Sequence, residues 1–219
     1  MEYEKQLRES GEYTEIEILE MISRRAILQY KVNYALDKVP NILDHKDKVI
    51  YDLIHGSAND CNSSTFREEI TLHQCDYENS PGKLGEDGFV PISKRPVEVK
   101  PQNATEGKKL GGNGQFTDFT HSRIKKCTDN NILMVVSGFF NGKLKFIVEF
   151  DFTSPIFLNH MTKKVNTGSL LEDGTKRQRS ASFGWNHWKG SNNLKLNYLS
   201  DNVDETMFSK PFLRYLKSF

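Results

Sequence analysis

Apolar residues in the first third of the chain follow the spacing of helices. They recur at close to helical intervals from Ile16 to Val32, and Thr14 with Glu17 forms a capping-box pair at the start of that segment. Shorter segments with the same character end before Gly56 or follow Ser64, a residue type that caps helices. We therefore predict helices over 14–36, about 44–54 and 64–75.

The spacing changes at the turn-rich segment 79–88. Beyond it, short apolar or alternating runs predict strands, and Asn141-Gly142 between two apolar runs predicts a hairpin. The predicted strands are 89–92, 95–100, 131–140, 143–152, 180–188 and 194–199, and the predicted later helices are 116–127, 154–165 and 210–219. The expected fold is α/β, with a central mixed β-sheet flanked by helices and a helical N-terminal third.

Length and composition favour one soluble domain. A chain of 219 residues buries a full core, and 37% of the residues are hydrophobic. We expect one domain over 1–219, with a mainly helical part (1–78), a sheet core (79–152) and a third part (153–219). No apolar run reaches the ~18–20 residues of a membrane span, and residues 1–15 lack the apolar core of a secretory signal, so we expect a cytoplasmic protein.

The cysteines and the distribution of charge limit the kinds of site and ligand to expect. Three widely spaced cysteines, without a CxxC pair, argue against disulfides and structural zinc. Residues 1–99 carry 12 Lys/Arg against 19 Asp/Glu, a net charge of −7, whereas residues 100–219 carry 18 against 10, a net charge of +8. The second half is therefore the expected polyanion-facing part of the molecule.

Three charged residues of the segment 85–103 form the candidate catalytic group. In "PVEVKP", Glu98 and Lys100 lie two residues apart, so a strand places both on one face. If the preceding strand pairs with this one, Asp87 arrives beside them. Two carboxylates bind Mg²⁺ well, and an ammonium orients an attacking water and offsets negative charge in phosphodiester hydrolysis. The alternative interpretation is a surface hairpin with scattered charges.

The sequence "EDG" followed by "VEVK" resembles the PD-(D/E)xK superfamily of nucleases, best known from type II restriction endonucleases. The resemblance covers about residues 64–152 and implies that Asp87 and Glu98 bind metal with the Val99 carbonyl, and that Lys100 organises the attacking water. Glu86 stands where the family commonly has proline.

The same resemblance implies two further site residues. An acid on the helix before the motif often faces the metal in this superfamily, and Glu69, or Glu68 beside it, occupies that position. Gln102 shares the strand face of Lys100 and is within reach of a scissile phosphate, although Pro101 weakens the pairing of that strand end. Solvated helix residues remain the alternative for both glutamates.

Cations flanking the motif are the candidate phosphate contacts, and the segment 172–193 adds residue types that read base edges. The predicted DNA-binding residues are Lys108, Lys109, Arg123, Lys125, Lys126, Lys176, Arg177, Arg179, Asn186 and His187, with Lys163 and Lys164 as further candidates.

We therefore expect a Mg²⁺-dependent endonuclease acting on double-stranded DNA, in the form of a type II restriction enzyme that works as a homodimer and has no membrane partner. The third part of the chain, 153–219, would supply DNA-recognition and dimer elements. Two alternatives stay open: a structure-specific or repair nuclease with the same site, and a non-catalytic DNA-binding protein.

Overall fold

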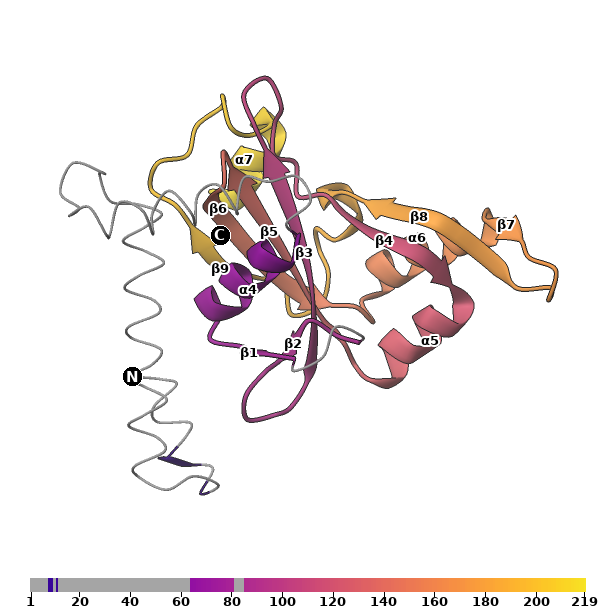
Figure 1. Ribbon diagram of the computed structural model, residues 1–219. Coiled ribbons are helices and arrows are strands. Elements are labelled where there is room, and N and C mark those ends of the chain that lie inside the picture. Colours follow the sequence, from indigo (N-terminus) through magenta and orange to yellow (C-terminus); the bar gives the residue numbers. More distant parts are fainter. Residues whose placement is uncertain (1–7, 10, 12–63, 81–84) are drawn as a thin grey trace.

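The computed structural model describes residues 8, 9, 11, 64–80 and 85–219, and in this part of the chain the protein is α/β (Figure 1). The predicted helices at 14–36 and 44–54, and with them the helical N-terminal third, lie outside the described residues. Two β-sheets and four α-helices make up the described part. The helices are α4 (Ser64–Gln74), α5 (His121–Asp129), α6 (Pro155–Asn166) and α7 (Lys210–Leu216).

The larger sheet is mixed and has six strands in the order β1-β2-β3-β5-β6-β9. β3 and β5 are parallel, and the other neighbours are antiparallel. Its strands are β1 (Glu78–Asn79), β2 (Gly88–Phe89), β3 (Pro96–Ala104), β5 (Leu133–Phe140), β6 (Lys143–Asp151) and β9 (Lys195–Leu199). The parallel pair requires a crossover connection, which β4 and α5 provide.

The smaller sheet is antiparallel, in the order β4-β8-β7, and extends away from the larger one (Figure 1). Its strands are β4 (Gly114–Thr120), β7 (Ser169–Leu170) and β8 (Lys176–Phe183). The segment predicted as a strand over 180–188 is a strand only to Phe183. A short 3-10 helix, Trp185–His187, follows it.

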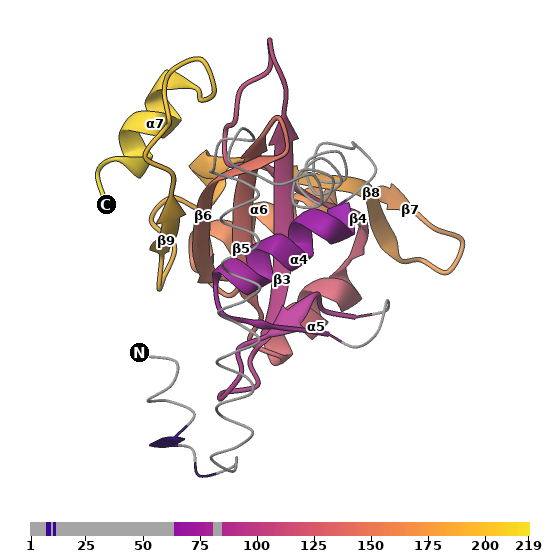
Figure 2. The same cartoon turned by 60° about the vertical axis from the view of Figure 1, so that its left-hand side comes forward.

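Each face of the large sheet carries its own hydrophobic core. Figure 2 shows α4 crossing one face in front of β3 and β5, with α6 behind the sheet. Val97, Val99 and Val135 pack on the α4 side with Ile70 and Leu72. The alternate residues Met134, Val136 and Val148 pack on the other side, with side chains of α5, α6 and α7. Because side chains alternate strictly along β3, Glu98 lies on the face of the sheet that does not carry α4.

The prediction of one helix over 116–127 is wrong at its beginning, because residues 114–120 form strand β4 and the helix starts at His121. Asp118 takes a left-handed conformation, with φ of 49°. This interrupts the alternation, so Phe116 and Phe119 are both buried, with ring centroids 4.6 Å apart. Two apolar residues three positions apart imitate helical spacing in the sequence.

The hairpin predicted at Asn141-Gly142 is confirmed. Asn141 and Gly142 have φ of 49° and 74°, the positive values that a two-residue type I′ turn requires at both positions. The turn sets the nine-residue strand β6 antiparallel to β5, and β6 pairs with β9 on its other side. The helix predicted to start at Pro155 is also confirmed as α6.

Strand β3 continues through Pro101 to Ala104. Asp87 N–H donates to the Val97 carbonyl at 3.0 Å, and Val99 N–H donates to the Asp87 side chain, so both valines direct their backbone groups toward β2. Pro101 has the same parity as these valines. Its missing N–H therefore falls on the edge side, and the ladder with β5 loses no hydrogen bond.

Candidate active site

Asp87 lies directly before β2 and reaches across to β3. Its Oδ2 accepts a hydrogen bond of 2.6 Å from the Val99 backbone N–H. The pairing of Gly88 with Val97 sets this register. The backbone of β2 and the side chain of Asp87 thus occupy successive positions along the same edge of β3, which brings the carboxyl beside the strand that carries Glu98 and Lys100.

Glu98 and Lys100 share one face of β3, as the sequence predicts. Lys100 Nζ lies 2.6 Å from Glu98 Oε1, and the Glu98 side chain is only 5% exposed. Lys100 Nζ also lies 4.8 Å from the centroid of the Phe116 ring of β4. The Lys100 ammonium therefore has a fixed position between a buried carboxylate and an aromatic face.

Arg123 of α5 is the second cationic partner of Glu98. Its guanidinium lies 3.3 Å from Glu98 Oε2. Thr120 begins α5 by accepting a hydrogen bond from the Arg123 backbone N–H, which fixes the first turn of the helix. Arg123, a predicted contact to DNA phosphate, forms an ion pair with Glu98 in this structure.

The Val99 carbonyl is directed toward the unpaired edge of β3. The N–H and C=O of one residue in a strand point to the same side, and the Val99 N–H points to Asp87. β2 begins at Gly88, which pairs with Val97, so β2 does not extend along the edge as far as Val99. The predicted third oxygen, the Val99 carbonyl, is thus on the Asp87 side.

Glu68, rather than Glu69, is the helix acid of the site. Glu69 is exposed, as is Thr65 four residues earlier, whereas Glu68 lies beside the buried face of α4. Burial raises the pKa of Glu68, and the nearby Glu98 charge raises it further, against the opposing effect of Lys100. The helical phase of the buried residues Arg67, Ile70 and Thr71 was the available signal.

The acidic cluster is defined here as Glu68, Asp87 and Glu98. Within this cluster the pKa of the Asp87 carboxyl is raised to about 7. Burial is the main cause, and the charges of Glu98 and Glu68 add to it, while Lys100 and the Val99 N–H oppose it. A carboxyl with this pKa ionises readily when a cation arrives. The ionised form of the acidic cluster is therefore destabilised by burial and by repulsion between its carboxylates, and a bound divalent ion would reduce that cost.

These donors fit a magnesium ion. Among residues 64–80 and 85–219, no three His, Cys, Asp or Glu side chains are grouped closely enough to hold a metal by themselves. Mg²⁺, however, commonly takes one or two protein carboxylates and completes its octahedron with waters and substrate phosphate oxygens. Asp87 and Glu98, with the Val99 carbonyl, supply that partial set.

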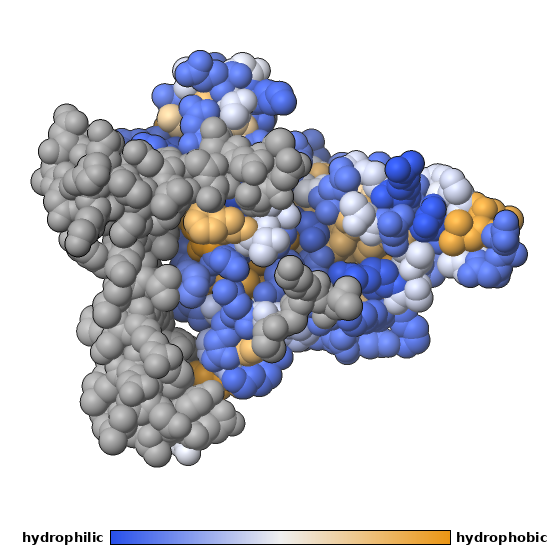
Figure 3. Space-filling model, viewed as in Figure 1, coloured by the Kyte–Doolittle hydropathy of each residue, from blue (hydrophilic) through white to orange (hydrophobic). Residues whose placement is uncertain are grey.

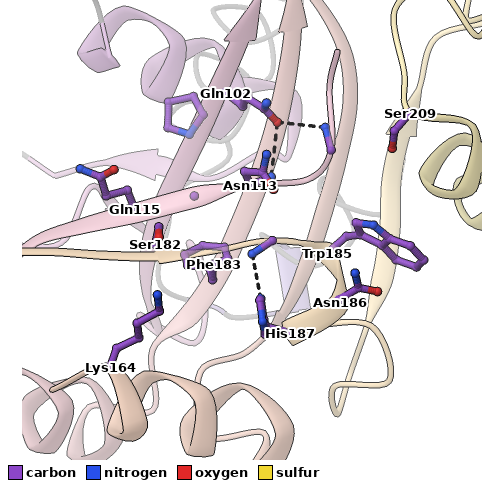
Figure 4. Close-up of a pocket in the computed structure, with 14 residues that line it drawn as sticks. Gln102, Asn113, Gln115, Lys164, Ser182, Phe183, Trp185, Asn186, His187 and Ser209 are labelled. Carbon is purple, nitrogen blue, oxygen red and sulfur yellow. Dashed lines mark hydrogen bonds between the residues drawn. The ribbon is translucent and has the colours of Figure 1, made fainter. Parts of the chain in front are cut away.

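Gln102 supports the neighbouring loop. Its Oε1 accepts long hydrogen bonds of 3.3 Å from the backbone N–H groups of Gly111 and Asn113 (Figure 4). The amide oxygen is thus used by the glycine-rich loop, whereas the amide nitrogen is the group left to contact a ligand. Gln102 is on the face predicted from its spacing to Lys100.

Several of the predicted DNA-binding cations have partners in the protein. Lys126 pairs with Glu86 at 2.8 Å, Lys125 with Asp129 at 2.5 Å and Arg177 with Asp118 at 3.5 Å. Lys109 donates to the Glu205 carbonyl and Lys176 to the Asn166 carbonyl. Exposed pairs of this kind contribute little to stability, so these cations remain able to exchange partners. Lys108, Lys163 and Arg179 are exposed, and Lys164 is half-buried.

The extension formed by β4, β8 and β7 carries three of these cations, Lys176, Arg177 and Arg179, all on β8. Figure 3 shows hydrophilic residues over the side of this extension that faces the viewer and a hydrophobic patch near its tip, where the Leu170 side chain is 69% exposed. Asn186 is exposed and His187 half-buried at the base of the extension, where both line a pocket with Gln102 (Figure 4). The structure thus connects the predicted base-reading residues to the strand of Lys100.

Asp87 depends on a close backbone approach at Gly88. A methyl group on Gly88 would lie 2.4 Å from the Glu78 carbonyl oxygen of β1 and 2.8 Å from a Leu72 methyl. We expect Gly88→Ala to lower the free energy of unfolding by about 1–3 kcal/mol, because backbone and helix must move apart. Urea denaturation measures the change, with Glu106→Ala in an exposed loop as the control. Equal stability of Gly88→Ala and wild type would contradict this packing.

No protein-family model matches the chain, and no curated protein matches it significantly. In the described part of the chain, no helix is long and apolar enough to cross a membrane. The functional conclusion therefore depends on the site itself.

Proposed function

We propose that the protein is a Mg²⁺-dependent endonuclease that hydrolyses phosphodiester bonds of double-stranded DNA. The observation that carries the proposal is that Asp87, at the edge of β3, lies close enough to Glu98 and Lys100 on one face of that strand, and to Glu68, for their charges to shift its pKa. The resemblance of "EDG…VEVK" to the PD-(D/E)xK nucleases supports it, as does the positive charge of residues 100–219.

The site residues divide the chemistry in the following way. Asp87, Glu98 and the Val99 carbonyl would hold Mg²⁺, which supplies Lewis-acid stabilisation of the charge on the phosphate. Lys100 orients the attacking water and donates to the phosphate as negative charge builds. The water oxygen forms a new bond to phosphorus, one ester P–O bond breaks, the proton lost by the water passes to solvent, and the leaving oxygen takes up a proton from solvent. The products are a phosphomonoester and a free hydroxyl.

Glu98 has a second role through Lys100. Because Glu98 is buried between the Lys100 ammonium and the Arg123 guanidinium, it holds both cations in place. When Glu98 holds a divalent ion, its carboxylate would bind Lys100 and Arg123 less tightly, and both cations could then contact the phosphate.

Sequence-specific restriction is the form of this activity we propose first. Cutting both strands of a palindrome requires two such sites, and a two-fold dimer provides them. The cations of the β4-β8-β7 extension, together with Asn186 and His187, would then contact the DNA beside the cut. The expected cytoplasmic location would give the protein access to DNA.

Incubation of plasmid and phage DNA with the protein tests the function. With Mg²⁺ we expect discrete fragments, and with EDTA intact DNA. Nicks confined to branched junctions would replace the restriction proposal by a structure-specific nuclease. Binding of DNA in a gel shift without any cutting, with Mg²⁺ or Mn²⁺, would overturn the nuclease and leave a DNA-binding protein.

A further inference from the structure

The pocket beside the candidate active site has a volume of about 760 Å³. It lies where the end of β3, the loop before β4, and the end of β8 meet, with Lys164 of α6 at one side and Trp185 at the other (Figure 4). Its size is within the range of about 300–1,000 Å³ that small-molecule sites occupy. The pocket is thus large enough for one nucleotide unit.

The lining is rich in side-chain amides and rings. Gln102, Asn113, Gln115 and Asn186 supply donors and acceptors, and Trp185 supplies an aromatic surface. Among the described residues that line the pocket, none is Asp or Glu. Amides of Asn and Gln pair with base edges, aromatic rings stack on bases, and a cation suits phosphate. Lys164 is the lining cation.

The walls of the pocket are preformed. The Gly184 N–H donates to His187 Nδ1 at 3.0 Å, which leaves Nε2–H as the donor of the neutral His187 ring. The His187 ring stacks on His160 at a centroid distance of 3.6 Å. Gly112 lies between the lining residues Gly111 and Asn113, and its carbonyl accepts a hydrogen bond of 2.8 Å from the buried Trp188 indole. A ligand therefore meets a rigid surface.

Strand β3 connects the pocket to the catalytic group. Pro101 and Gln102 line the pocket directly after Lys100, and Gln102 lies about 7 Å along the same strand face from Lys100. A methyl group on Gly114 would lie 2.9 Å from Lys100 Cβ, so the floor of the pocket touches the lysine itself. A polynucleotide with its scissile phosphate at Lys100 has its next nucleotide within reach of the pocket.

We propose that this pocket binds one nucleotide of the DNA strand adjacent to the scissile phosphate, with the base against the amides and Trp185 and the phosphate toward Lys164. This inference rests on the proposed nuclease function. It adds a specificity-determining group, Gln115, Asn186 and Trp185, that the catalytic residues do not include. The absence of carboxylates among the lining residues described above favours a polyanion over a cationic ligand.

Mononucleotide binding tests the pocket without cleavage. We expect dAMP, dGMP, dCMP and dTMP to quench the fluorescence of Trp185, excited at 295 nm, to different extents, and inorganic phosphate alone to bind much more weakly. Asn186→Ala and Gln115→Ala should each weaken the preferred nucleotide about threefold to tenfold, the loss of one or two hydrogen bonds. Both residues are exposed, so the fold should tolerate the changes. Trp185→Phe should remove the fluorescence response.

Thr117→Ala, an exposed position on β4 outside the pocket, is the matched control and should bind like wild type. In DNA cleavage, Asn186→Ala should reduce the discrimination among fragments more than Thr117→Ala does. Cleavage that proceeds while no mononucleotide binds, with all variants cutting like wild type, would overturn the pocket and keep the nuclease. Nucleotide binding lost in Asn186→Ala but without any cleavage by wild type would overturn the nuclease and keep the pocket.

Discussion

Replacing Lys100 by methionine is expected to lower the rate of DNA cleavage at least about 100-fold, the usual contribution of a positioned proton donor or charge stabiliser. Methionine keeps the unbranched stem that lies near the Phe116 ring and removes only the ammonium. Arg123 remains as a partner of the buried Glu98 carboxylate. The fold should therefore persist while the attacking water loses its orienting group.

Single-turnover cleavage of plasmid DNA in Mg²⁺ measures the rate, and a gel shift in Ca²⁺ measures binding. We expect binding by Lys100→Met to stay within about threefold of wild type, because one phosphate contact of several is lost. Lys217→Met is the matched control, since Lys217 is exposed after α7 and lies outside the predicted DNA-binding residues. Equal cleavage by Lys100→Met and Lys217→Met would remove Lys100 from the mechanism.

The parity of β3 made the approach of Glu98 and Lys100 predictable. Alternation in "PVEVKP" required Glu98 and Lys100 to share a face, and the structure places Lys100 Nζ 2.6 Å from Glu98 Oε1. The hairpin at Asn141-Gly142 and the strands on each side of it were predictable for the same reason, since a period of two and a turn dipeptide are local signals.

Partners distant in the sequence were not predictable in this way. Arg123 reaches Glu98 only because β4 and α5 form the crossover between β3 and β5, and no local pattern specifies that distance. Because Asp118 takes a left-handed conformation, the apolar residues Phe116 and Phe119 of strand β4 have the spacing of a helix in the sequence. The choice between Glu68 and Glu69 depended on the phase of α4, which the neighbouring Ile70 and Thr71 specify once the helix is known.

The acidic cluster makes a second large effect expected, on stability rather than rate. The Asp87 pKa is raised from 3.8 to about 7 in the folded protein. Between these two pH values the folded state binds more protons than the unfolded state, so stability falls as the pH rises through this window. Each tenfold change in the ionisation constant corresponds to about 1.4 kcal/mol, and the penalty above pH 7 thus reaches up to about 4 kcal/mol.

Asp87→Asn removes this penalty and keeps the hydrogen bond, because the Asn oxygen accepts the Val99 N–H in the same way. Without metal at pH 8, we therefore expect the variant to be more stable than wild type, by up to about 4 kcal/mol. The gain should shrink as the pH falls toward 4, where the wild-type carboxyl is protonated in the folded state. Urea denaturation of both proteins in EDTA measures the difference in their free energies of unfolding at pH 8 and at pH 5.

Calcium is expected to reduce the difference in stability between the two proteins. A divalent ion that binds only the folded state stabilises it by about 2.7 kcal/mol at a hundredfold excess over its dissociation constant. We expect Ca²⁺ to stabilise wild type at pH 8 and to leave Asp87→Asn nearly unchanged, since the variant lacks one of the two carboxylates. Asp129→Asn, exposed on α5, should respond to Ca²⁺ like wild type. If Asp87→Asn is less stable than wild type in EDTA at pH 8, the Asp87 carboxylate supports the fold. The repulsion on which the proposed cation site depends would then be absent.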